Sequence, residues 1–102
     1  MSAAKQLIVV VGSHELDAVS MNRTQMRELT KLRKAAKADL ENDEAIEGAN
    51  EYMEQLLKEL YPAIASDFGE LPNRELMVLA NITEQFSAGL PVDVIEALIK
   101  NA

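Results

Sequence analysis

The chain has 102 residues, of which 48% are hydrophobic and 26% are charged, and its formal net charge is −7. This length and composition are typical of one folded domain, so they argue against two domains and against a disordered segment. Because the chain contains no cysteine, a disulfide framework, a thiolate nucleophile and a thiolate zinc site are excluded, which favours a cytoplasmic protein.

Membranes and nucleic acids are poor candidates as partners. The longest apolar run, Leu7 to Val11, is far shorter than the roughly 20 residues of a membrane span and lacks the pattern of a signal peptide. The net negative charge repels phosphate backbones and acidic lipids. We therefore expect neither a membrane nor a nucleic acid as partner.

The first predicted element is a β-hairpin within residues 5–20. A β-branched run is followed by the turn residues Gly12-Ser13, and the next residues alternate so that Glu15 and Asp17 share one face. A rival interpretation makes the run before Gly12 the first strand of a nucleotide-binding unit. The single glycine, without a glycine-rich phosphate loop, argues against it.

A basic amphipathic helix is predicted to follow. Asn22 and Gln25 form a capping-box pair at its start. Apolar residues then recur every three or four positions: Met26, Leu29, Leu32, Ala36 and Leu40. Six basic residues and one acidic residue between Arg23 and Lys37 give this segment a charge of +5. Its outer stripe consists of Arg23, Arg27, Lys31 and Lys34.

The second predicted helix is acidic, covers about residues 45–60 and is stopped by Pro62. Its outer positions are Glu44, Glu47, Glu51 and Glu54. Eight acidic residues and one lysine between Asp39 and Glu59 give this segment a charge of −7. The interior Gly48 predicts a close helix crossing or a weak point. Opposite charges on successive helices favour salt-dependent contacts between copies, and hence a homo-oligomer.

Two further helices complete the predicted fold. Ser66 to Glu70 is predicted to be a turn, or one helical turn capped by Ser66, and Pro72 suits the first turn of a helix that Gly89 ends. A final helix is expected from Val92 to about Ile99. The fold class is therefore mainly α: a single domain of residues 1–102, with a hairpin at 5–20 and about four helices in a small bundle-like arrangement within 22–102.

The final helix is apolar around most of its circumference, which leaves more apolar surface than one packing contact hides. We therefore expect it to bind a partner, together with the basic stripe. The candidate partner-binding residues are Val92, Val94, Ile95, Leu98, Ile99, Arg27 and Lys31.

Candidate catalytic or metal-binding groups are nearly absent. His14 is the only histidine, so we interpret it as an ordinary polar residue of the hairpin. The acidic spacing from Asp39 to Asp43 is similar to the start of a calcium loop, but Glu44 replaces the glycine at the sixth position and Asn50 the glutamate at the twelfth. We expect no enzymatic activity, no catalytic residue, no cofactor and no metal.

The basic stripe also raises the possibility of nucleic-acid binding. The aromatic residues that would stack on bases are four and lie elsewhere in the sequence: Tyr52, Tyr61, Phe68 and Phe86. We therefore favour contacts of this stripe with acidic protein surface, in the same chain or in another copy.

Several segments in order resemble the tail assembly chaperones of long-tailed bacteriophages, over nearly the whole chain. They are the hairpin from Val9 to Leu16, the capped helix start from Met21 to Leu29, the acidic junction, Leu56 to Pro62, Ser66 to Pro72 with Glu75-Leu76, and the helix end from Phe86 to Gly89. Asn22 stands where a threonine cap is frequent in that family, and it preserves capping.

This resemblance implies a transient, non-enzymatic role in the bacterial cytoplasm. Such chaperones coat the tape-measure protein and are lost as tube subunits polymerise, so they are not expected in the mature virion. A longer, frameshifted form often adds an extension that binds the tail tube protein. Two competing interpretations are a structural head-tail or tail-completion protein and a small regulatory nucleic-acid-binding protein.

Overall fold

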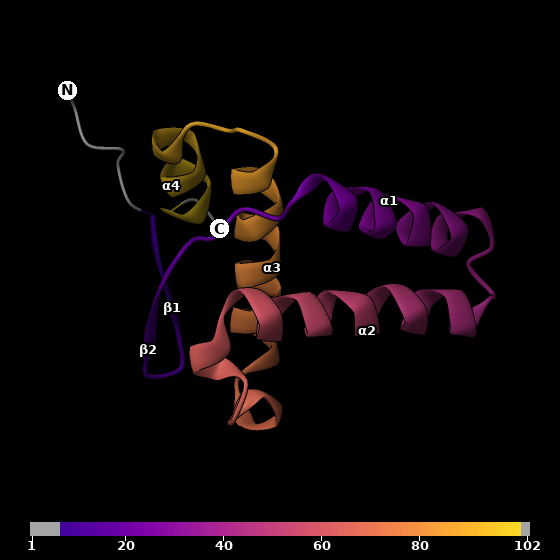
Figure 1. Cartoon of the computed structure of the whole chain (residues 1–102), viewed down its shortest axis with the longest axis horizontal. Helices are drawn as coiled ribbons and strands as arrows, with labels where there is room; N and C mark the ends of the chain where they lie inside the picture. Colours follow the sequence, from indigo (N-terminus) through magenta and orange to yellow (C-terminus); the bar gives the residue numbers. More distant parts are fainter. Residues whose placement is uncertain (1–6, 101–102) are drawn as a thin grey trace.

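The computed structural model describes residues 7–100 and has a short β-hairpin followed by helices (Figure 1), which confirms the predicted mainly α fold class. The elements in chain order are β1 (Ile8–Val11), β2 (His14–Asp17), α1 (Arg23–Ala38), α2 (Asp43–Leu60), the 3-10 turns η1 (Pro62–Ile64) and η2 (Phe68–Glu70), α3 (Asn73–Ser87) and α4 (Val92–Lys100). The predicted hairpin start at Lys5 and the final residues Asn101 and Ala102 lie outside the described range.

The hairpin has the predicted two-residue turn. Its strands pair antiparallel, with Val10 opposite Glu15 and Val11 opposite His14, so that Gly12-Ser13 connects them. Gly12 has φ = +60°, a backbone conformation that glycine adopts most readily. Strand alternation turns Val11 into the core and leaves Val10 exposed.

Helix α1 begins with the predicted capping box. The Gln25 N–H donates to Asn22 Oδ1 at 2.8 Å, and the Asn22 N–H donates to Gln25 Oε1 at 2.9 Å. The prediction that Leu40 continues the apolar face is wrong, because α1 ends at Ala38 and Leu40 is 77% exposed. Asp39 accounts for the end, since its carboxylate accepts the Glu41 N–H and so favours a turn.

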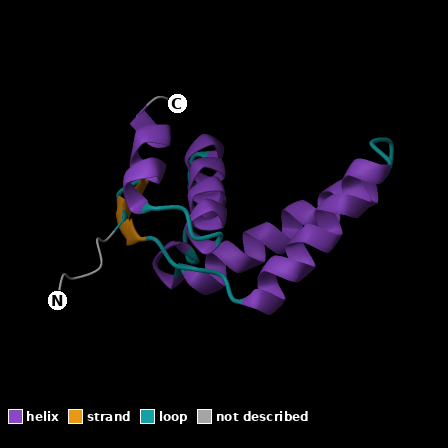
Figure 2. Ribbon diagram, turned by 90° about the horizontal axis from the view of Figure 1, so that it is seen from above, coloured by secondary structure: helices purple, strands orange, loops and turns teal. Residues whose placement is uncertain are grey.

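Helices α1 and α2 pack side by side and extend away from the remaining elements as an arm (Figures 1 and 2). Asn42 caps α2 by accepting the Ala45 N–H at 3.2 Å. Pro62 follows the end of α2, as predicted, and opens η1, which was not predicted. The expected close crossing at Gly48 is wrong, because no other element of the chain approaches within 4 Å of the position that a β-carbon of residue 48 would occupy.

Helix α3 occupies the centre of the molecule and lies between α4 and the arm in both views (Figures 1 and 2). Pro72 immediately precedes its first residue, and η2 follows Asp67 instead of being capped by Ser66. At the far end, Gly89 has φ = +89° and the Leu90 N–H bonds back to the Gln85 carbonyl. This glycine termination of α3 confirms the predicted helix end.

The largest fully buried side chains come from four different elements, so one core joins the hairpin to the helices. They are Val11, Ile64, Leu79, Thr83 and Ile95. Within residues 7–100, none of the helices combines the length and the apolar character of a membrane span.

Candidate functional site

An open groove of about 830 Å³ runs along α1 to the end of α3. We call it the basic groove, because four of its residues are cationic and none is acidic. It is lined by Met21, Arg23, Met26, Arg27, Thr30, Lys31, Lys34 and Ser87. The predicted partner-binding residues Arg27 and Lys31 therefore lie together in one concave surface.

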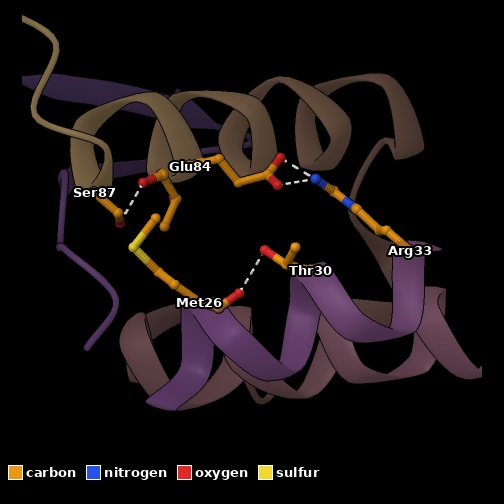
Figure 3. A network of polar contacts seen from close by, with 6 residues as sticks. Met26, Thr30, Arg33, Glu84 and Ser87 are labelled. Carbon is orange, nitrogen blue, oxygen red and sulfur yellow. Dashed lines mark hydrogen bonds and ion pairs between the residues drawn. The ribbon is translucent and has the colours of Figure 1, made fainter. Parts of the chain in front are cut away.

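Hydrogen bonds from α3 fix the end of the groove where α1 begins. The Met21 N–H donates to Ser87 Oγ at 2.8 Å, and the Ser87 hydroxyl donates to the Thr83 carbonyl at 2.6 Å. Figure 3 shows the Met26 side chain pointing toward Ser87. The Thr30 hydroxyl bonds within α1, to the Met26 carbonyl at 2.8 Å. The groove thus combines a methionine surface with two hydroxyls and a row of cations.

Arg33 also belongs to α1 but lies outside the groove, and its charge is paired within the chain. Its guanidinium forms a bidentate ion pair with the Glu84 carboxylate of α3, in which Nη2 lies 3.0 Å from Oε2 (Figure 3). This pair ties the arm to α3. It is one instance of the basic helix meeting acidic surface in the same chain.

Helix α4 exposes a row of apolar side chains. Val94 is 45% exposed, Leu98 is 48% exposed and Ile99 is 37% exposed; we call these three residues the α4 ridge. Val94 and Leu98 are four positions apart, and so lie one above the other on the helix surface.

The other two predicted partner-binding residues of α4 face inward. Ile95 is fully buried, and Val92 is half-buried against the core. The assignment of Ile95 to a binding surface is therefore wrong, because a side chain without exposed area cannot contact a partner. Ile95 instead anchors α4 to the core and so determines which side of the helix forms the ridge.

The only histidine connects the hairpin to the turn before η2. His14 Nε2 lies 3.0 Å from Asp67 Oδ2. The hydrogen bond from His14 lowers the pKa of Asp67, and the nearby imidazole charge acts in the same direction. This pair could not be predicted from the sequence pattern, because the two residues are 53 positions apart.

The acidic residues that are similar to a calcium loop lie at the tip of the arm. Asp39, Glu41 and Asp43 are all exposed. Across residues 7–100, no group of three or more acidic or histidine side chains is arranged to hold a metal ion.

No protein-family model matches the chain, and neither a curated protein nor a solved structure gives a significant match. The resemblance to tail assembly chaperones therefore stays a hypothesis. The candidate surfaces for binding a partner are the basic groove and the α4 ridge.

Proposed function

We propose that this chain is a non-enzymatic tail assembly chaperone of a bacteriophage or prophage. It acts in the host cytoplasm and binds the tape-measure protein during tail morphogenesis. The observation that carries the proposal is the α4 ridge: Val94, Leu98 and Ile99 are exposed on a helix whose other side is anchored in the core by Ile95. The tail tube protein is a second candidate partner.

The ridge suits an extended helical partner. Apolar side chains four positions apart on one helix pack against the apolar stripe of another helix. Burying a Val, Leu or Ile side chain completely contributes about 1.5–3 kcal/mol, so covering three side chains that are already about half-buried contributes about 2–4 kcal/mol per copy.

A binding contribution of this size per copy is consistent with a coat of chaperone copies that binds the tape-measure protein reversibly. One copy alone binds weakly, which permits displacement when tube subunits polymerise. Many copies along one tape-measure protein, in contact with one another, bind together more firmly than each does alone. The net charge of −7 favours solubility of such a complex.

The test is co-expression with the tape-measure protein of the same phage. The chain is expected to co-purify with that protein and to be absent from purified virions. If it is instead found in virions in a fixed copy number, the chain is a structural head-tail or tail-completion protein and the proposal is wrong.

A second candidate function, nucleic-acid binding, is favoured by the four cations of the basic groove. None of the chain's aromatic residues lines that groove, so a base would find no stacking surface there. Retention on RNA that falls steeply with salt would support this candidate over the chaperone.

A further inference from the structure

The outer face of α2 has the charge opposite to that of the basic groove. We call this surface the acidic face; it consists of Glu44, Glu47, Glu51 and Glu54, all of which are exposed. Residues three and four positions apart on a helix lie side by side, so these carboxylates form one continuous row along the arm.

Both rows of charge lack partners within the described chain. Within residues 7–100, Arg33 pairs with Glu84, and His14 pairs with Asp67. Asp93 and Glu96 have interaction partners as well. None of the four cations in the groove and none of the four carboxylates of the acidic face takes part. Their charges are therefore available to another molecule.

The two rows also match in length. At about 1.5 Å per residue, the cations from Arg23 to Lys34 extend over about 16 Å, and the carboxylates from Glu44 to Glu54 extend over about 15 Å. The spacings within each row are three or four residues. A helix that presents the acidic face can thus place one carboxylate near each cation of the groove.

We infer that the basic groove of one copy binds the acidic face of α2 of a second copy. The contact joins two different surfaces, so it is heterologous and builds a ring or an open array. The Met26 side chain, which is half-buried in the groove, supplies adaptable apolar contact beside the row of ion pairs. This inference goes beyond the proposed function, because it concerns contacts between copies and leaves the α4 ridge uncovered.

A charge-swap experiment tests this contact directly. One variant carries Arg27→Glu and Lys31→Glu in the groove, and the other carries Glu47→Lys and Glu51→Lys on the acidic face. Each variant alone opposes like charges, so we expect its self-association to weaken about tenfold or more relative to the wild type. A mixture of the two variants restores opposite charges and is expected to associate again. Sedimentation at low and high salt measures the wild type, each variant and the mixture.

Matched controls separate this contact from a general effect of net charge. Glu15→Lys with Asp17→Lys makes on the hairpin the same charge change as the acidic-face variant. Arg74→Glu matches the single change Arg27→Glu. All three control residues are exposed and lie outside the two surfaces. These controls are expected to associate like the wild type. Circular dichroism verifies that each variant keeps its helices, and the single changes Arg27→Glu and Glu51→Lys replace any double variant that unfolds.

The inference is overturned if the wild type stays monomeric at all concentrations and salt levels, or if mixing the two variants does not restore association. It is also overturned if the groove variant associates normally but loses retention on RNA, since the groove would then bind nucleic acid. The α4 ridge is unchanged in every one of these variants. The test of self-association is therefore independent of the test of tape-measure binding, and either can fail without the other.

Discussion

The hydroxyl oxygens of Tyr61 and Thr83 lie 2.7 Å apart in the core. The Thr83 hydroxyl donates its hydrogen to the Leu79 carbonyl at 2.7 Å, so the hydrogen between the two hydroxyls comes from Tyr61. The tyrosine oxygen in turn accepts the Val19 N–H at 3.0 Å. One phenol therefore ties the segment between the hairpin and α1 to the central helix α3.

We predict that Tyr61→Phe destabilises the protein by about 1–3 kcal/mol, because it leaves the Val19 N–H without its acceptor and the Thr83 oxygen without the hydrogen that Tyr61 donates. Tyr52→Phe is the matched control: this tyrosine is half-buried and its hydroxyl makes no hydrogen bond within residues 7–100. Its effect should stay within about 0.5 kcal/mol. Urea unfolding measures both, and equal losses for the two variants would contradict the role of the Tyr61 hydroxyl.

Interactions between nearby residues account for the parts of the fold that the sequence predicts. The Asn22–Gln25 capping box, the Gly12-Ser13 turn and the end of α3 at Gly89 each depend on a few consecutive residues. The wrong continuation to Leu40 has a local cause as well, since Asp39 bonds to the backbone and competes with the helix.

Contacts between distant segments could not be predicted in the same way. Tyr61 meets Val19 across 42 positions, and His14 meets Asp67 across 53. The candidate site could likewise be predicted only in part. The pattern placed Arg27 and Lys31 on an exposed face, but α4 is apolar nearly all round, so periodicity alone did not identify Ile95 as the buried residue.

Two glycines are predicted to respond in opposite ways to the same substitution. Gly12→Ala should destabilise the protein by about 1–2 kcal/mol, because an alanine is strained at positive φ. Its new methyl group would also lie 3.0 Å from Leu71 Cδ2. Gly48→Ala should stabilise it by about 0.5–1 kcal/mol, because the site lies inside α2 with open space around it. Thermal or urea unfolding of the two variants checks this prediction, which fails if both shift in one direction.

The Asp67 carboxylate makes stability depend on pH at the acidic end. Its pKa in the folded chain lies below the ordinary value of 3.8, chiefly because of the hydrogen bond from His14. The unfolded chain therefore takes up this proton first as the pH falls. The stabilisation that the ionised Asp67 contributes is complete when the pH is above the pKa of the unfolded chain. It is lost as the pH falls through the lowered pKa of the folded chain.

The corresponding variant is Asp67→Asn. The difference in unfolding free energy between the wild type and this variant should narrow as the pH falls from neutral to below about 3. Asp17→Asn, the same substitution at an exposed acid on β2, serves as the control for the loss of one carboxylate. A difference for Asp67→Asn that is constant over the whole range would contradict the linkage.

Variants of α4 separate folding from partner binding. Leu98→Asp and Val94→Asp place a charge on the α4 ridge, so we expect wild-type stability and loss of co-purification with the tape-measure protein. Ala97→Asp puts the same charge on an exposed position of the same helix beside the ridge and should still bind.

Ile95→Asp should lower the free energy of unfolding by about 3 kcal/mol or more, because it buries a carboxyl group in place of a core side chain. Circular dichroism and co-purification measure the two properties. If the Leu98 and Val94 variants unfold as Ile95→Asp does, the ridge is part of the core, and if they fold and still bind, the tape-measure protein is recognised elsewhere.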